Sequence, residues 1–505
     1  QGVYAGGTIN VTGNSSVGVY TEVPTRPVLA GKNDDHGLAN TSGKTVGTET
    51  VEVSGKITVS GTGSSGVYAK DTGSITLKDN KNDADADNKT TAKIEVTGTK
   101  SYGAVLDGLK LNLEENTEIN VTGKEAIGYV LKSGTGSNKG TISVTGHAAN
   151  TDTTPSLGFY GEKGTFTNEK EGTISSSGNY ANAVALVGNT TTGVVFNNKG
   201  KIKTEGKGNI GVYADGKYTF EHDGTDAKIS VGTNAVGIYA KNAAGALNIK
   251  APIDIAASGG TGANAGTTIG IYSDGEAKVK FGDNSKLTIG EGAVGLYSSD
   301  ASKFNNTFEF ETGKKLTVEL KERSVFGLLN GATATDVPLS KYLNNGTTDK
   351  IEITQFGEGA SIFYATSNAK AVLDKDYTVT NGTAASTSVL VANDGASVKI
   401  ASGKKLETNT NVGLIANANG AVAENEGTLE STRTEKGIGI YAKDATAKNT
   451  GTNATITMNN KEAVGMLGLV GSTLTNSAKI ELKGISSAGM YGENSDLTNS
   501  TASSQ

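Results

Sequence analysis

Two acidic residues and a histidine stand next to one another in the segment Thr21–Thr50, as Asp34, Asp35 and His36. Glycoside hydrolases use two carboxyl groups held at a defined separation on either side of the scissile bond. Neighbouring aspartates in one loop do not set such a separation, and the whole chain has only three histidines. We therefore interpret the segment as a solvated loop, with hydrolysis as the weaker alternative. Its weak candidates for ligand binding are Arg26, Lys32, Asp34, Asp35 and His36.

A second acidic segment, DNKNDADADN at Asp79–Asn88, has the alternating carboxylates of a calcium loop at Asp83, Asp85 and Asp87. It lacks the glycine that turns such a loop after the third acid. Ile94 also occupies the place of the bidentate glutamate. We treat the segment as a weak calcium candidate only, and we predict no metal or other cofactor.

The composition argues against several other classes of function. The chain has no cysteine, so disulfides and thiolate nucleophiles are excluded, and it contains no Gly-x-Ser-x-Gly motif. The net charge is −6, with both signs interspersed, so no basic stripe is present to neutralise phosphates. We expect no nucleic-acid partner. No apolar run approaches the roughly 18 residues of a membrane-spanning helix.

Tyrosine recurs at one position of a repeated motif, which reads apolar residue, glycine, apolar residue, tyrosine, small residue. One copy is VGIYA at Val236–Ala240, and 11 of the 17 tyrosines occupy this position. In a strand, Val236, Ile238 and Ala240 share one face, so we predict that they point inward and that the tyrosine points outward. The predicted tyrosine ladder contains Tyr68, Tyr213, Tyr239, Tyr272, Tyr297, Tyr441 and Tyr491.

The ladder has a structural and a functional interpretation. Stacked aromatic neighbours stabilise adjacent strands, by about 0.5–1 kcal/mol per pair. Alternatively, the rings form a stripe that binds sugars or a protein partner. We favour the structural role, because several copies replace the ring by an aliphatic side chain that keeps the packing. These copies have Val105, Val130, Leu329, Ile415 and Leu467 at the tyrosine position.

Two further elements accompany each motif and must position it. One reads like INVTG at Ile9–Gly13, and its first apolar residue lies nine positions before the motif glycine, as in Ile9 and Gly18. The other follows the motif, as in KVKFGDN at Lys278–Asn284. Apolar residues alternate with polar ones in all three elements, and Gly, Asn, Thr and Ser separate them. This pattern predicts three short strands in each period of about 25 residues.

Three strands per period of this length predict an all-β fold, a parallel β-helix in which each strand pairs with its counterpart one coil away. Counting a partial copy at Gly2–Ala5, we expect about 18 turns in one solenoid over residues 1–505. Because Gln1 opens inside the repeat, we interpret the chain as a segment of a longer protein. The predicted insertions lie near residues 21–50, 78–92, 147–156, 257–268 and 331–350.

The combination of an IxVTG element nine residues before VGVYA or IGIYA, with connectors such as TNEKEGTIS and NNKGKIKTEG, resembles a known family. It is similar to the passenger region of the very large fusobacterial type V autotransporter adhesins, over the whole chain. The resemblance implies a right-handed β-helix on the bacterial cell surface. It also implies an outer-membrane barrel, which would follow the passenger and is not in this sequence.

The resemblance further implies a non-enzymatic adhesin that binds a host-cell receptor or glycan, partner bacteria, or both. We expect it to be monomeric. Two alternatives remain, a carbohydrate-active β-helix of the lyase or glycosidase type and a stalk that only supports a distal binding tip. A cleft lined by three or more charged side chains on neighbouring coils would favour the enzyme.

Overall fold

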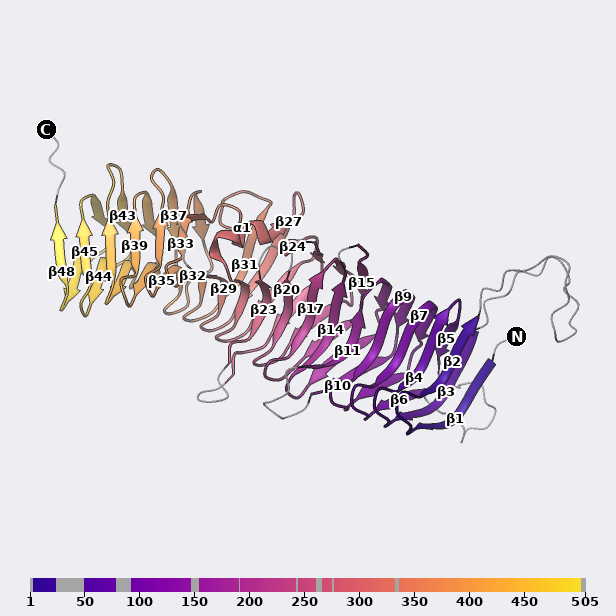
Figure 1. Cartoon of the computed structure of the whole chain (residues 1–505). Coiled ribbons are helices and arrows are strands. Elements are labelled where there is room, and N and C mark those ends of the chain that lie inside the picture. Colours follow the sequence, from indigo (N-terminus) through magenta and orange to yellow (C-terminus); the bar gives the residue numbers. More distant parts are fainter. Residues whose placement is uncertain are drawn as a thin grey trace, which may run out of the picture. The chain divides into compact units, whose positions relative to one another are not determined.

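The computed structural model is built almost entirely of β-strands, as Figure 1 shows. In the part of the chain that it describes, helix is limited to a 3-10 turn, η3 (Ala301–Lys303), and one short helix, α1 (Phe304–Thr307). No helix in these residues is long and apolar enough to cross a membrane. The structure describes residues 3–23, 50–78, 92–146, 154–189, 191–241, 244–259, 266–274, 277–331 and 336–500.

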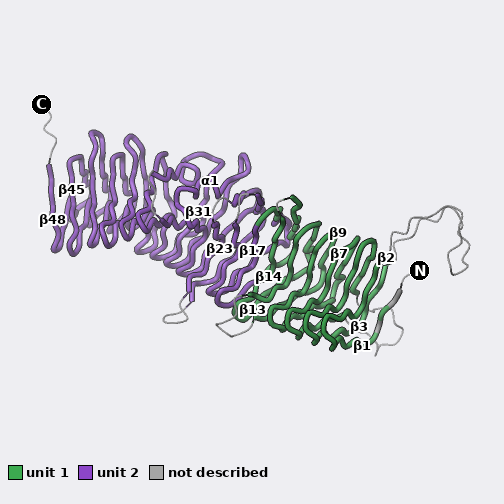
Figure 2. Tube along the Cα trace, viewed as in Figure 1, with its two compact units in different colours: residues 1–203, 216–220 green, residues 204–215, 221–505 purple. Residues whose placement is uncertain are grey.

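The strands divide between two compact units, which Figure 2 colours separately. Unit 1 comprises residues 1–203 and 216–220, and unit 2 comprises residues 204–215 and 221–505. Each unit is a parallel β-solenoid, or β-helix, so the predicted fold class is confirmed. The single solenoid over residues 1–505 stays a prediction.

The coils contain the three strands that the sequence predicts. In unit 2, for example, β21 (Ala246–Ile249), β22 (Pro252–Ile255) and β23 (Ile269–Asp274) form one coil. Each of them pairs in parallel with the strand at the same position of the next coil. We call strands at the β23 position motif strands, those at the β22 position IxV strands and those at the β21 position third strands.

The bounds in unit 1 are as follows. The motif strands are β2 (Val17–Val23), β4 (Ser65–Asp71), the first halves of β7 (Tyr102–Leu113) and β9 (Ile127–Asn138), β11 (Ser156–Gly161) and β14 (Ala181–Gly188). The IxV strands are parts of β1 (Val3–Val11) and β3 (Thr50–Val59), then β6 (Lys93–Val96), β8 (Glu118–Val121), β10 (Thr141–Thr145), β13 (Thr173–Ser177) and β16 (Lys201–Thr204). The third strands are the remaining parts of β1, β3, β7 and β9, with β5 (Ser74–Leu77), β12 (Gly164–Asn168), β15 (Val194–Asn198) and β18 (Tyr218–His222).

Unit 2 repeats the same order. Its motif strands are β17 (Ile210–Gly216), β20 (Val236–Lys241), β23, β26 (Val294–Ser298), β29 (Val325–Asn330), β32 (Ser361–Thr366), β35 (Ser388–Asn393), β38 (Val412–Asn417), β41 (Ile438–Lys443), β44 (Val464–Leu469) and β47 (Ala488–Glu493). Its IxV strands are β19 (Lys228–Val231), β22, β25 (Lys286–Ile289), β28 (Lys315–Leu320), β31 (Lys350–Phe356), β34 (Tyr377–Val379), β37 (Lys405–Thr408), β40 (Thr428–Ser431), β43 (Thr455–Met458) and β46 (Lys479–Leu482). Its third strands are β21, β24 (Lys278–Phe281), β27 (Phe308–Phe310), β30 (Val337–Pro338), β33 (Lys370–Leu373), β36 (Ser397–Ile400), β39 (Val422–Asn425), β42 (Thr446–Asn449), β45 (Thr473–Asn476) and β48 (Asp496–Asn499).

The described residues hold 17 motif strands, one fewer than the 18 copies counted in the sequence. The difference is the partial copy at Gly2–Ala5. In β1, Val3 pairs with Val51 of β3, and Val51 pairs with Ile75 of β5, which is a third strand. The first copy therefore belongs to a third strand, although its sequence resembles the motif.

The alternation along a motif strand breaks at its glycine, which the sequence prediction missed. In β20, Ile238 and Ala240 are fully buried, as expected, but Val236 is only half-buried. Gly237 is absent from the pairing between β20 and β23, which joins Val236 to Ile269 and then Ile238 to Ile271. Because the alternation resets at this residue, the first apolar residue of the motif joins the tyrosine on the outer face.

A close approach of neighbouring coils explains why glycine recurs at this position. A Cβ atom added to Gly237 would lie 2.5 Å from the carbonyl oxygen of Gly270 and 2.6 Å from a methyl group of Val231. In unit 1, a Cβ on Gly103 would lie equally close to the oxygen of Gly128. Such distances are too short for any side chain unless the coils move apart.

Aromatic rings fill parts of the interior. In unit 1, Tyr129 is completely buried beside Phe159 and Phe166, and its hydroxyl donates to the carbonyl of Leu111 at 3.0 Å. In unit 2, Tyr342 packs against the rings of its neighbours and donates to the carbonyl of Phe308 at 3.0 Å. Tyr342 belongs to the predicted insertion 331–350. The described part of that insertion therefore contributes to the core instead of forming a free loop.

Asparagines, all but Asn499 of them buried, form ladders where the third strands end. In unit 1, Asn138 donates to Asn168, and Asn168 donates to Asn198, each at 2.8 Å. In unit 2, three bonds of 2.8 Å join four asparagines in the same way. These bonds satisfy side-chain amides that burial would otherwise leave unpaired. The asparagines of the unit 2 ladder are Asn425, Asn449, Asn476 and Asn499.

Candidate functional site

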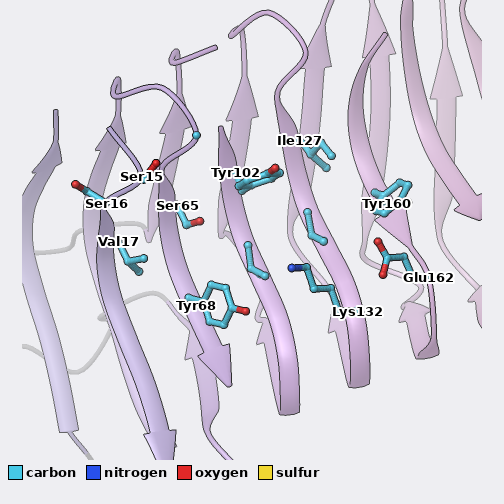
Figure 3. A pocket seen from close by; sticks show the side chains of 13 residues that line it. Ser15, Ser16, Val17, Ser65, Tyr68, Tyr102, Ile127, Lys132, Tyr160 and Glu162 are labelled. Carbon is cyan, nitrogen blue, oxygen red and sulfur yellow. The ribbon is translucent and has the colours of Figure 1, made fainter. Parts of the chain in front are cut away.

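The outer face of the motif strands in unit 1 is hollowed into a groove of about 560 Å³ (Figure 3). The groove crosses β2, β4, β7, β9 and β11, which belong to five successive coils. We call it the motif groove. Its lining residues are Ser15, Ser16, Val17, Gly63, Ser65, Tyr68, Tyr102, Val105, Ile127, Val130, Lys132, Tyr160 and Glu162.

One row of the lining comes from the first position of the motif. Ser65 pairs with Tyr102, and Tyr102 pairs with Ile127 of the next coil. Val17 begins this row and is 40% exposed. The row exists only because the alternation resets at the motif glycine, which turns first-position side chains away from the core.

The second row comes from the tyrosine position. Tyr68 pairs with Val105, Val105 with Val130, and Val130 with Tyr160. The two valines are 2% and 3% exposed, whereas both tyrosines are half-buried. The short side chains therefore form the floor of the groove, and the rings rise on either side of them.

Charged and hydroxyl groups stand at one edge of the groove. Burial, followed by the charge of Glu162, raises the pKa of the Tyr160 hydroxyl. Tyr68 donates to Asp107 at 3.5 Å. Lys132 is exposed and has no hydrogen-bond or ion-pair partner among the described residues, and Figure 3 shows its amine over the groove. The groove thus combines an apolar floor with one available cation.

The same motif position looks different in unit 2, where four successive coils carry tyrosine. The ring centroids lie 5.6 Å apart for Tyr213 and Tyr239, and 4.8 Å apart both for Tyr239 and Tyr272 and for Tyr272 and Tyr297. The hydroxyl of Tyr239 donates to Asp274 at 3.1 Å, and its pKa is raised, mainly by burial. These four residues form a continuous ladder.

The other members of the predicted ladder have different surroundings. Tyr441 pairs with Ile415 on one side and Leu467 on the other, so it stacks on no ring. Tyr491 is 51% exposed. The assignment of Leu329 to the tyrosine position was wrong. Leu328 pairs with Tyr297 and Tyr364, and Leu329 is fully buried at the small-residue position, so the motif in β29 is displaced by one residue.

A second hollow in unit 1, of about 490 Å³, is lined by charged side chains. It contains Glu115, Glu118 and Glu171, with Lys139 beside them. Glu118 is paired with Lys93 at 3.3 Å, and Lys139 is paired with Glu114 at 2.8 Å. This acidic hollow meets the criterion set above for an enzyme, although ion pairs engage three of its four charged groups, since Glu171 is also paired with Lys170 at 3.3 Å.

The remaining predicted site residues cannot be placed. Arg26, Lys32, Asp34, Asp35 and His36 lie outside the described residues, and so do Asp83, Asp85 and Asp87. Within the described ranges, no group of three or more His, Asp or Glu side chains could hold a metal ion.

The motif groove contains one residue of the predicted structural ladder, Tyr68, and none of the predicted ligand-binding candidates. The other lining residues were missed, because Val105 and Val130 were assigned a packing role only. Two short residues between two tyrosines also occur in unit 2, between Tyr364 and Tyr441, so this pattern alone does not predict the groove.

No protein-family profile matches the chain. No curated protein matches it either.

Proposed function

We propose that the chain is a non-enzymatic adhesive passenger segment of a bacterial surface protein. The observation that carries this proposal is the motif groove, a hollow of ligand size on the outer face of the motif strands. Ligand sites are typically concave and lined by apolar and aromatic side chains with a few polar groups. The partners in this proposal are a host-cell receptor or glycan and partner bacteria.

The physics of a solenoid suits this role. Each coil contacts only its neighbours, so the chain can fold progressively from one end as it emerges outside the cell. Side chains fixed on paired strands also hold a binding surface without the entropic cost of ordering a loop. In this proposal the segment is displayed at the cell surface and tethered to an outer-membrane barrel, as in the resembled family.

The test is adhesion of the purified 505-residue chain to cultured host cells and to partner bacteria. The decisive variant is Tyr68→Ala with Tyr160→Ala, which removes both ring walls of the motif groove. Its matched control is Tyr441→Ala, at the same motif position in unit 2 and outside the groove. Loss of adhesion in the groove variant alone supports the proposal.

A second comparison concerns the predicted insertion 21–50, which contains the weak ligand-binding candidates named above. Deletion of residues 24–49 tests it independently of the groove. Adhesion that depends on this segment and survives the groove variant would move the receptor site to the insertion. Absence of adhesion by the intact chain would contradict the adhesive function itself.

The acidic hollow favours a carbohydrate-active β-helix as the second candidate. Three glutamates around one hollow could supply a general acid and a general base for cleavage of a polysaccharide. The matching test measures release of reducing ends or of unsaturated products from acidic and neutral polysaccharides. Activity that disappears in Glu118→Gln, in a chain that shows no adhesion, would establish the enzyme in place of the adhesin.

A further inference from the structure

We propose that the motif groove binds a glycan chain that carries a carboxylate, with pyranose faces on the tyrosine rings and the carboxylate on Lys132. This inference rests on the proposed function and names the ligand class of the same site. Three features of the groove support it, namely its ring walls, its unpaired cation and its closed backbone.

The ring walls match the shape of a sugar. Tyr68 and Tyr160 stand on either side of the valine floor, and Tyr102 lies in the adjoining row (Figure 3). A pyranose has an apolar face of C–H groups and a rim of hydroxyls, so it can lie on an aromatic ring while its rim stays hydrated. Successive coils are about 4.8 Å apart. One monosaccharide spans a comparable length, so a linear glycan can place successive sugars over the successive coils between Tyr68 and Tyr160.

The cation selects an acidic ligand. Lys132 and Glu162 occupy adjacent coils, since the preceding residues Leu131 and Gly161 are paired. Glu162 lies two residues after Tyr160, and no ion pair within 4.0 Å joins Glu162 to Lys132 in the described structure. The amine of Lys132 is therefore available to an external carboxylate. A negatively charged sugar would meet it beside the apolar floor, where water screens the attraction less.

The backbone beneath the groove argues against a peptide ligand. An extended peptide adds to a sheet through the free edge of a strand. In the groove, β7 is paired with β4 on one side and with β9 on the other, so no such edge is available. The volume of about 560 Å³ also fits a small ligand. A stable protein partner needs roughly 800 Å² of surface on each side.

The experiment measures binding of the intact chain to oligosaccharide pairs that differ in the carboxylate. One pair is sialyllactose and lactose, and the other is a hyaluronan oligosaccharide and a chitin oligosaccharide of equal length. We expect the acidic member to bind at least about tenfold more tightly. The first pair tests recognition of a terminal sialic acid, and the second tests recognition of a uronic acid within the glycan chain.

Two variants test the contributions of the lysine and of one ring wall separately. Lys132→Met should reduce the affinity for the acidic sugar to that for the neutral one, and Tyr160→Ala should weaken both by about tenfold or more. The control for the first variant is Lys443→Met. Lys443 occupies the same strand position in unit 2, is exposed and lies outside the motif groove. Its replacement should leave binding unchanged.

Two results would overturn the inference. One is equal affinity for acidic and neutral sugars, and the other is no affinity for either pair. Adhesion to cells that survives enzymatic removal of their glycans, yet is lost in Tyr68→Ala with Tyr160→Ala, would replace the glycan by a protein receptor. The proposed function would then stand while this inference fails. Absence of all adhesion by the intact chain would instead remove the proposed function.

Discussion

The motif groove of unit 1 and the tyrosine ladder of unit 2 lie on the outer faces of motif strands that are otherwise alike, yet the two surfaces differ. In unit 2, Tyr213, Tyr239, Tyr272 and Tyr297 stack from coil to coil and cover their own surface. In unit 1, Val105 and Val130 interrupt the row between two tyrosines, and the groove opens over them.

The difference separates two roles for one repeat position, namely packing in the ladder and, in the proposed binding site, contact with a ligand. A ring that lies between two rings has both faces in contact with them. A ring that stands beside a valine keeps one face free for a ligand. The structural interpretation of the tyrosine position therefore describes the unit 2 ladder well, and the proposed ligand site in unit 1 would add a second role to it.

The comparison holds only if the strands beneath the two faces are equivalent. Gly103→Ala in unit 1 and Gly237→Ala in unit 2 test this equivalence. Each added methyl group would lie 2.5 Å from a carbonyl oxygen of the next coil and 2.6 Å from an aliphatic methyl group. We expect each to lower the local stability by about 2–3 kcal/mol, because overpacking forces backbone shifts.

Hydrogen exchange followed by mass spectrometry is the suitable measurement for both glycine variants. A long repeat array need not unfold in one step, and exchange reports the opening free energy of each segment. The control is Gly403→Ala, where nothing lies within 4 Å of the added carbon and only the positive φ of 69° opposes the change. Unequal losses of stability at the two motif glycines would show that the backbone packing beneath the two faces also differs.

The next prediction concerns the ladder in unit 2. Tyr239→Ala removes ring contacts at 5.6 and 4.8 Å and the hydroxyl bond to Asp274. Tyr441→Ala removes a ring of similar burial that lies between two aliphatic residues. We expect a loss of about 2 kcal/mol for Tyr239→Ala, with about 0.5–1.5 kcal/mol of it due to the aromatic pairs and therefore absent for Tyr441→Ala.

A double-mutant cycle isolates the stacking itself. Replacement of Tyr239 and Tyr272 by leucine, singly and together, keeps the apolar bulk and removes the ring pair. The opening free energies of β20 and β23 should then be non-additive by about 0.5–1 kcal/mol. Additive losses would indicate that the ladder stabilises its coils through burial alone.

The third prediction concerns a variant in which the groove of unit 1 is given the continuous row of rings found in the unit 2 ladder. Val105→Tyr with Val130→Tyr would give unit 1 an uninterrupted row of rings from Tyr68 to Tyr160 and would fill the groove with protein side chains. We expect sugar binding to fall by about tenfold or more while stability stays equal or rises slightly. Val391→Tyr, at the same position in unit 2, is the control and should leave binding unchanged.

The outcome of that conversion bears directly on the groove. Undiminished sugar binding by a correctly folded double variant would place the ligand elsewhere on the chain. Circular dichroism in the near ultraviolet and hydrogen exchange over β7 and β9 would establish that the variant is folded.

Much of this architecture follows from the sequence, because the repeated copies show which strands pair from one coil to the next. The period, the three strands per coil and the inward position of Ile238 and Ala240 all follow from alternation and spacing. The outward turn of Val236 does not, because a rule of period two holds only while every residue takes part in the ladder. Gly237 leaves that ladder, and only its contact with Gly270 shows why.

The groove was beyond prediction for a related reason. Its rows come from residues that are adjacent only across coils, so Val105 must be aligned with Val130 and Tyr160 before a hollow can be expected. Insertions of different lengths separate these copies, and a displacement by one residue, as found at Leu328, changes which side chains share a row. The spacing in the sequence fixes such an alignment only where the copies are regular.

The last prediction tests a surface that should not differ between the units, the charged face of the IxV strands. In unit 1, Glu95 accepts from Lys56 at 2.7 Å, and in unit 2, Glu430 accepts from Lys405 at 2.7 Å. These lysines lower the pKa of both carboxyl groups below the usual value of 4.5. A carboxyl group with a lowered folded pKa stabilises the fold above its unfolded value and loses that contribution as the pH falls through the folded value.

We therefore expect Glu95→Gln and Glu430→Gln to cost each unit about 0.5 kcal/mol or less at pH 7, since both pairs are partly exposed. The difference from the unmodified chain should shrink as the pH falls below 4.5 and should also shrink in high salt, which screens surface pairs. Local opening free energies, measured across this pH range, provide the check. A difference that persists in acid would mean that the glutamates act through packing and not through charge. If the pH dependence appeared in one unit only, the contrast between the units would extend beyond the motif strands, and the groove would no longer be the feature that distinguishes them.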